Sequence, residues 1–259
     1  MKTMKIEQFL TWAFVQELPK AGAGEGGGSF IMRSASDILE DIAELGTIID
    51  RTPNAFGVQP GSIFEGEPHA DAVLAGQAVR ALAAHEGFEI PEGWNPFPEF
   101  DDEHGLIAAE VARVVKELTV RGNRINGKHV VNLVITSAVM GRGPVWSAEQ
   151  PEIEMIGAHG KPAWFIQSKG KDAFGRSCIY ETDGYDRKAQ RPKPGAYRKH
   201  RLAWSSRGSI LGRLDWQLWQ SALEQLSRTF GIGLTEHRLS EFRPNRSPWQ
   251  RTKTREISL

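Results

Sequence analysis

The chain has 259 residues, of which 40% are hydrophobic and 25% are charged, a composition typical of a globular protein. No stretch approaches the roughly 18 to 20 consecutive apolar residues that a transmembrane helix needs, so we expect no membrane partner and a cytoplasmic location. Cys178 is the only cysteine, which excludes a disulfide bond within the chain.

The formal net charge of zero conceals two parts of opposite sign. Residues 1–110 carry 6 Lys and Arg against 19 Asp and Glu, a net charge of −13. Residues 111–259 carry 26 Lys and Arg against 13 Asp and Glu, a net charge of +13. A strongly basic part favours an anionic partner, or contact with the acidic part of the chain.

Apolar residues at helical spacing predict helices over residues 5–18, 34–50, 69–86 and 102–118. The first of these is amphipathic and interrupted by charged residues, which argues against a signal peptide. The run AGAGEGGG over residues 21–28 is interpreted as a flexible linker. A phosphate-binding loop is not favoured there, because a helix and not a strand precedes the glycines.

Two further features belong to the helical part. The string DDEH at residues 101–104 is interpreted as the N-terminal cap of the following helix, because carboxylates are favoured at the positive end of the helix dipole. Residues 128–140 are rich in β-branched side chains, but their length and the glycine that follows favour a helix. No spacing of histidines and cysteine fits a metal centre, so neither a metal nor a cofactor is expected.

The pattern changes after Pro144, where short alternating segments are separated by turn residues. We predict strands over residues 153–156, 163–168 and 177–182, which would form an antiparallel three-stranded meander. A long amphipathic helix is predicted over about residues 209–230.

This order of elements predicts the α+β fold class, since helices come first and strands are grouped after them. The predicted organisation is a mostly helical acidic region over residues 1–146 and a basic region, the β-meander plus the long helix, over residues 147–259.

One enzymatic alternative is a Mg²⁺-dependent nuclease. Pro151-Glu152 followed by Gln167-x-Lys169 resembles the PD-(D/E)xK nuclease core, in which an acid on one strand faces an acid-x-lysine on the next. A turn near residue 160 would place Glu152 across from Gln167, where Glu152 would hold Mg²⁺ and Lys169 would stabilise the scissile phosphate. Gln167 stands where the second carboxylate is needed, so enzymatic activity is not the favoured prediction.

The favoured prediction is nucleic-acid contact by a basic loop. Residues 183–213 combine Lys and Arg, which neutralise phosphates, with aromatic side chains, which stack on unpaired bases. The alternative is a protein–protein interaction module without enzymatic activity. The predicted nucleic-acid-binding residues are Arg187, Lys188, Arg191, Lys193, Tyr197, Arg198, Lys199, Arg201, Trp204, Arg207 and Arg213.

Several phrases in the C-terminal part support a family resemblance. They are DAFGR (172–176), DGYDRK (183–188), RPKPGAYRK (191–199), RLDWQLWQSAL (213–223) and SPW (247–249), with an echo in EGWNP (92–96). These phrases resemble an uncharacterised family of bacterial prophage-encoded proteins. The resemblance implies a bacterial or phage context and brings no catalytic residue with it.

Overall fold

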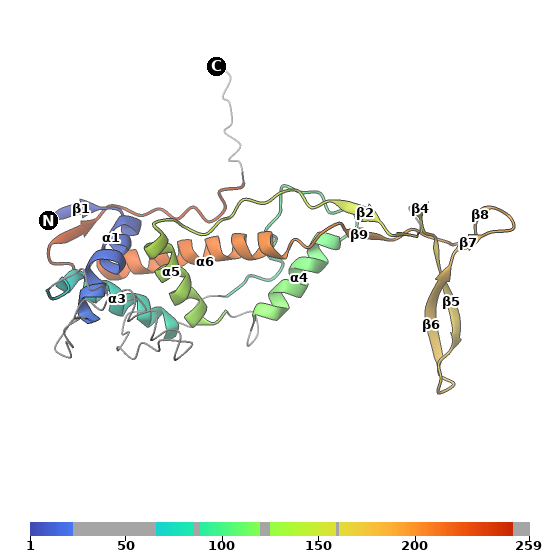
Figure 1. The fold of residues 1–259 in the computed structure, drawn as a ribbon, viewed down its shortest axis with the longest axis horizontal. Helices are drawn as coiled ribbons and strands as arrows, with labels where there is room; N and C mark the ends of the chain where they lie inside the picture. Colours follow the sequence, from blue (N-terminus) through green and yellow to red (C-terminus); the bar gives the residue numbers. More distant parts are fainter. Residues whose placement is uncertain (23–65, 85–88, 120–124, 159–160, 251–259) are drawn as a thin grey trace, which may run out of the picture. The chain divides into compact units, whose positions relative to one another are not determined.

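The computed structural model describes residues 1–22, 66–84, 89–119, 125–158 and 161–250 (Figure 1). These residues form both helices and small strand pairs, so the fold class is α+β. The helix expected over residues 34–50 and most of the glycine-rich segment 21–28 lie outside the described residues.

The chain divides into two compact units, each made of separate stretches of sequence. Unit 1 comprises Met1–Trp94, Leu118–Ser147 and Gly212–Leu259, and unit 2 comprises Asn95–Glu117 and Ala148–Leu211. This grouping differs from the two consecutive regions expected from the sequence, because the C-terminal stretch returns to the N-terminal helices.

The described residues of unit 1 contain four α-helices. These are α1 (Ile6–Trp12), α3 (Ala70–Ala81), α5 (Gly127–Met140) and, from Gly212 onward, α6 (Arg207–Phe230). The chain after α1 continues as a π-helical turn, η1 (Ala13–Glu17), and a 3₁₀ turn, η2 (Leu18–Gly22), and α3 ends in the 3₁₀ turn η3 (Leu82–Ala84).

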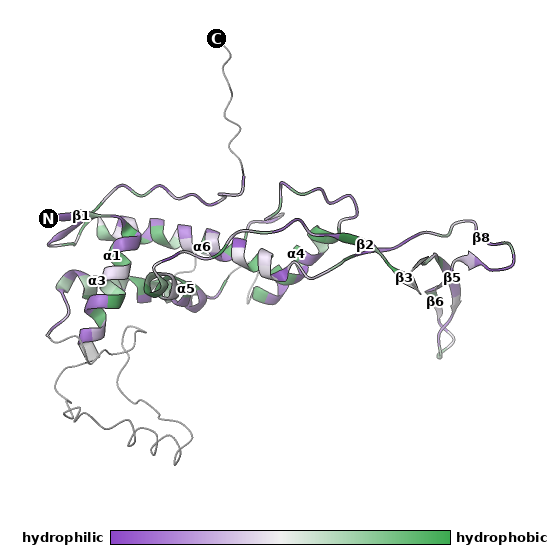
Figure 2. Cartoon of the chain, turned by 45° about the horizontal axis from the view of Figure 1, so that its top comes forward, coloured by the Kyte–Doolittle hydropathy of each residue, from purple (hydrophilic) through white to green (hydrophobic). Residues whose placement is uncertain are grey.

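The core of unit 1 is the apolar face of these helices, as their sequence periodicity predicts. Figure 2 shows hydrophobic and hydrophilic residues on different sides of α6. Helix α3 buries the small residues Ala72, Ala75 and Gly76, which lets neighbouring helices approach closely. Fully buried side chains include Phe9, Phe14, Leu82, Val134, Leu223 and Leu226.

The segment with mixed helix and strand signals, residues 128–140, is helical, and its caps explain why. The side chain of Asn126 accepts a hydrogen bond from the backbone N–H of Lys128 at the start of α5. Gly141 closes the helix in the left-handed conformation, with φ of 63°, which glycine adopts without strain. Local capping thus outweighs the β-propensity of the branched side chains.

A parallel strand pair that the sequence did not predict joins distant parts of unit 1. Strand β1 (Lys2–Met4) pairs with β10 (His237–Leu239), so that Thr3 lies beside Arg238. Parallel pairing needs a long connection, and here nearly the whole chain separates the two strands.

Unit 2 contains most of α4 (Leu106–Leu118) and a series of two-stranded ladders. The Asp102 carboxylate accepts hydrogen bonds from the backbone N–H groups of Ile107 and Ala108 at 3.1 and 2.8 Å, so the predicted N-terminal cap is confirmed. The strands are β2 (Ile153–Met155), β3 (Gly157–Ala158), β4 (Lys161–Pro162), β5 (Phe165–Lys171), β6 (Ser177–Asp183), β7 (Tyr185–Asp186), β8 (Arg191–Pro192) and β9 (His200–Leu202).

The expected three-stranded meander is only partly present. Strands β5 and β6 form the predicted antiparallel hairpin. Strand β2, however, pairs with β9 and not with β5, while β3 pairs with β4 and β7 with β8.

Among the described residues, no helix combines the length and the apolar character that crossing a bilayer requires.

Candidate nucleic-acid interface

Each face of the β5–β6 hairpin carries both polar and apolar side chains. Cross-strand partners share a face, so Lys169 lies beside Ile179 on one face, and Ser168 lies beside Tyr180 on the other. Ile179 is 66% exposed and Tyr180 48% exposed. A two-stranded hairpin that exposes such side chains in water is of marginal stability by itself.

The tip of this hairpin is fixed by a carboxylate. Asp172 Oδ1 accepts hydrogen bonds from the backbone N–H groups of Phe174 and Arg176 at 2.9 and 2.8 Å. Gly175, with φ of 77°, donates its N–H to the carbonyl oxygen of Asp172 at 3.0 Å. These bonds define the turn, so the Asp172 carboxylate shapes the backbone at the tip.

The turns on either side of β7 use carboxylates in the same way. Asp183 accepts a hydrogen bond from the N–H of Tyr185, and Asp186 accepts from Lys188 and Ala189. The two N–H groups of Ala189 and Lys188 lower the pKa of the Asp186 carboxyl. It therefore stays ionised while it holds the turn.

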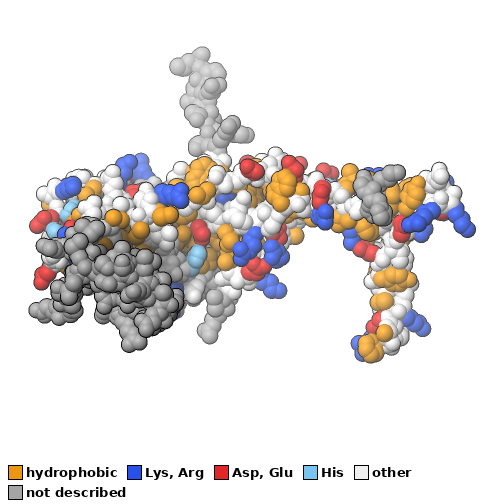
Figure 3. Space-filling view, viewed as in Figure 1, with side chains coloured by type: hydrophobic (Ala, Val, Ile, Leu, Met, Phe, Trp, Pro, Cys, Tyr) orange, Lys and Arg blue, Asp and Glu red, His pale blue; other side chains and the backbone are white. Residues whose placement is uncertain are grey.

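Residues 161–202, which we call the arm, carry a clear excess of positive charge. They contain 11 Lys and Arg against 4 Asp and Glu, a net charge of +7. Figure 3 shows Lys and Arg side chains gathered at the β7–β8 loop and at the far end of the β5–β6 hairpin, where hydrophobic side chains are also exposed.

Three of the arm's cations have carboxylate partners. Lys199 pairs with Glu181, Arg201 Nε lies 2.7 Å from a carboxylate oxygen of Glu154, and Arg187 lies 3.8 Å from Asp183. The hydrogen bonds from Lys199 and Tyr197 lower the pKa of the Glu181 carboxyl. Within the described part of the chain, seven others have no carboxylate partner: Lys169, Lys171, Arg176, Lys188, Arg191, Lys193 and Arg198.

Two of these seven have other contacts that hold them in place. Lys193 Nζ donates to the backbone carbonyl oxygen of Asp183 at 3.0 Å. Because a carbonyl oxygen is neutral, this bond does not offset the positive charge of Lys193. The Arg198 guanidinium lies 4.5 Å from the centre of the Trp164 ring and donates to the sulfur of Met155. Both cations are thus oriented by the arm while their charge stays available to an anion.

Three of the predicted nucleic-acid-binding residues, Trp204, Arg207 and Arg213, lie outside the arm. Trp204 is 51% exposed, and Arg207 pairs with Glu117 of α4 at 3.3 Å. Arg213 is only 2% exposed, and its Nε donates to the carbonyl oxygen of Trp146 at 3.3 Å. Its guanidinium lies 4.7 Å from the centre of the Trp249 ring, so Arg213 is a core residue of unit 1 and not part of a water-facing basic surface.

The predicted nuclease arrangement is not formed. Gln167 lies across from Glu181, and Lys169 lies across from Ile179. Glu152 instead borders β9, where its carbonyl oxygen accepts the N–H of Ala203 at 2.9 Å. The physical reason is that Phe165 leaves the expected ladder and exchanges two 2.8 Å backbone hydrogen bonds with Tyr197.

Sequence reasoning missed the hairpin tip. Phe174 is 86% exposed there, between the cations Lys171 and Arg176. The signal was present in the sequence, because Lys169 and Lys171 recur with the period of a strand and an Asp-x-x-Gly turn follows.

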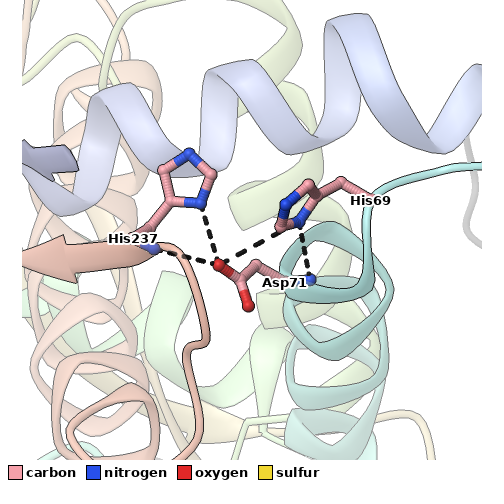
Figure 4. A group of neighbouring side chains, drawn as sticks. All are labelled: His69, Asp71 and His237. Carbon is pink, nitrogen blue, oxygen red and sulfur yellow. Dashed lines mark hydrogen bonds and ion pairs between the residues drawn. The ribbon is translucent and has the colours of Figure 1, made fainter. Parts of the chain in front are cut away.

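A second cluster, in unit 1, could hold a metal ion by composition. His69 and Asp71 at the start of α3 meet His237 of β10, and their candidate ligand atoms all lie within 4.8 Å of one another (Figure 4). Asp71 is 1% exposed and His237 is 7% exposed. His69 caps the helix, since its Nδ1 accepts the N–H of Asp71 at 3.0 Å.

The hydrogen bonds of this cluster argue against a metal. Asp71 Oδ1 accepts the N–H and the hydroxyl of Thr235, both at 2.8 Å. Asp71 Oδ2 accepts the N–H groups of Glu236 and His237, each at 3.1 Å, and lies 2.8 Å from Nδ1 of His237. A carboxylate has about four lone-pair positions, and these donors occupy them. We call this arrangement the Asp71 clamp, because it binds α3 to residues 235–237.

Comparisons with other proteins give no assignment: no family model, no curated protein and no solved structure matches this chain.

Proposed function

We propose that this chain binds nucleic acid through the arm, residues 161–202, and that the binding is not catalytic. The observation that carries the proposal is the set of seven cations without a carboxylate partner among the described residues. The arm carries 11 Lys and Arg against 4 Asp and Glu, so its own carboxylates leave a net charge of +7. Phosphate groups are the anions that such a surface attracts most strongly.

The exposed apolar side chains of the hairpin also support nucleic-acid binding by the arm. Phe174, Ile179 and Tyr180 lie among the cations and supply contacts to sugars and bases that lysine and arginine cannot make. The similarity of the C-terminal phrases to prophage-encoded proteins supports DNA of a bacterium or phage as the first nucleic acid to test.

The test is equilibrium binding to labelled single- and double-stranded oligonucleotides over a salt series. If all seven cations contact phosphates of a duplex, the logarithm of the binding constant falls with the logarithm of salt with a slope of about −6. We expect the variant Lys188→Ala/Arg191→Ala to make this slope shallower, from about −6 to about −4, and to weaken binding to all sequences alike.

The matched control is Arg80→Ala/Lys128→Ala, which removes two exposed cations from unit 1 and changes the net charge of the molecule equally. This control should bind as the unaltered chain does. Absence of binding at 50 mM salt, or equal weakening in both double variants, would refute the proposal.

A protein–protein interaction module is the second candidate, favoured by the exposed Ile179 and Phe174. It predicts a complex whose stability changes little with salt, since apolar contacts are not screened. Size-exclusion chromatography at 50 and 500 mM salt separates this candidate from the first.

A further inference from the structure

We infer that Phe174 is a wedge that enters the base stack of duplex DNA, so that the partner of the arm is a double helix bent at the site of contact. This inference rests on the proposed nucleic-acid function and names its ligand. Its first support is exposure: an 86% exposed phenylalanine leaves unused most of the free energy that burial of its ring would release.

The turn beneath Phe174 fixes the backbone that carries the ring. The N–H of Phe174 is bound to Asp172 Oδ1, as is the N–H of Arg176 two residues later. The N–H of Asp172 in turn donates to the carbonyl oxygen of Arg176 at 2.9 Å and closes the hairpin. A wedge needs such support, because an ordered turn loses little conformational entropy when the ring inserts.

The charges around the ring fit the DNA groove. Lys169, Lys171 and Arg176 flank the tip, and none of them has a carboxylate partner in the described chain. The nearest acid, Asp172, is occupied by two N–H donors. Cations beside an apolar side chain at a protruding tip are the combination that minor-groove binding proteins use to unstack one base step while contacting the flanking phosphates.

The dimensions of the hairpin agree with this placement. Strands β5 and β6 have seven residues each, and a rise of about 3.3 Å per residue gives a length of about 23 Å. A ribbon of this length reaches across a DNA groove while its base stays outside.

The other aromatic side chain of the hairpin distinguishes duplex from single-stranded partners. Tyr180 packs over Gly170 so closely that a Cβ added to this glycine would lie 2.4 Å from Tyr180 Cε1. One face of the Tyr180 ring is therefore covered by the hairpin itself. Single-strand binding needs several open rings for successive bases, whereas this hairpin offers one open ring at its tip.

The experiment uses the full chain and a 30-base-pair duplex with donor and acceptor dyes at its ends. We expect the unaltered chain to raise the energy transfer by bending the duplex, and Phe174→Ala to abolish the change and weaken binding about tenfold. Ile232→Ala removes an exposed apolar side chain outside the arm and should retain the bend. A 2-aminopurine base at the kinked step should brighten with the unaltered chain and stay dim with Phe174→Ala.

The outcomes separate this inference from the function on which it rests. If the chain binds the duplex but Phe174→Ala bends it equally, the wedge is wrong and the proposed function stands. Tighter binding to single strands than to the duplex also overturns the wedge. If no nucleic acid binds at low salt, both proposals fall. Phe174→Ala must keep the thermal midpoint of the unaltered chain, as expected for a side chain exposed at a turn.

Discussion

At the scale of single residues, the buried Asp71 joins α3 to residues 235–237 through several hydrogen bonds. Burial alone would raise the pKa of its carboxyl. The hydrogen bonds from Thr235, His237 and Glu236 outweigh burial and hold the pKa well below its usual range. Asp71 is therefore ionised, and this role could not be predicted from the sequence, because the donors lie more than 160 positions away.

We predict that Asp71→Asn lowers the free energy of unfolding by about 3 kcal/mol, because an amide would direct its own N–H groups at buried donors. Urea unfolding followed by circular dichroism measures this. The control is Asp215→Asn, whose carboxylate binds His129 at 2.8 Å on a more exposed part of unit 1. That pair contributes less than about 1 kcal/mol, so equal losses in the two variants would contradict the clamp.

The pH dependence gives the same prediction a second measurement. A carboxyl whose pKa is lower in the folded state stabilises the fold above its unfolded pKa, about 3.9, and this stability is lost as the pH falls below that value. The difference in stability between the unaltered chain and Asp71→Asn should therefore be constant from pH 7 to pH 5 and shrink from pH 4 to pH 2. A difference that grows in acid would have the wrong sign.

At the scale of elements, helices were predictable where strand partners were not. Periodicity and caps are local, so α5 could be read from its apolar spacing, Asn126 and Gly141. The hairpin of β5 and β6 is local too, and it was predicted. Strand β2 pairs with β9, more than 40 residues away. Neither segment has a sequence pattern that distinguishes β9 from β5 as the partner of β2.

Helix α6 contains a glycine whose role only the structure reveals. A Cβ added to Gly212 would lie 2.3 Å from the carbonyl oxygen of Val145, so the backbone of residue 145 crosses the helix at this point. Gly208, in the same helix, has no atom within 4 Å of its added Cβ. The two positions therefore respond in opposite ways to the same substitution.

We expect Gly212→Ala to destabilise the chain by about 2 kcal/mol, because overpacking exceeds the gain in helix propensity. Gly208→Ala should be neutral or stabilise by up to about 1 kcal/mol. Thermal unfolding of both variants measures the difference. A stabilised Gly212→Ala would show that residue 145 does not contact α6 in solution.

At the scale of the whole molecule, net charge conceals the arrangement of charge. The sequence located the basic segment, but it could not separate Arg213, which is buried, from Arg191, which is exposed, because both are simply cations in a basic stretch. It also could not show that the acids of the arm are used in turns. The prediction of a basic loop was therefore incomplete at the hairpin tip and too long at its C-terminal end.

The division into units predicts a strong effect of C-terminal truncation. A chain that stops at Leu234 lacks β10 and every donor to the Asp71 carboxylate, and it lacks the Asn245 carbonyl oxygen that accepts the N–H of Trp216 at 2.7 Å. We expect this chain to lose cooperative urea unfolding. The control Glu241→Ala/Arg243→Ala removes an exposed ion pair from the same stretch and should change the free energy of unfolding by less than about 0.5 kcal/mol.

The pairing of β1 with β10 has a consequence for synthesis on the ribosome. Residues 2–4 leave the ribosome well before their partner strand, which follows roughly 10 to 50 s later at about 5 to 20 residues per second. The β5–β6 hairpin needs only its own 19 residues and can close within microseconds of leaving the exit tunnel. A nascent chain can therefore form the β5–β6 hairpin before unit 1 is complete, and a product of premature termination before residue 235 lacks the donors that hold the Asp71 carboxylate.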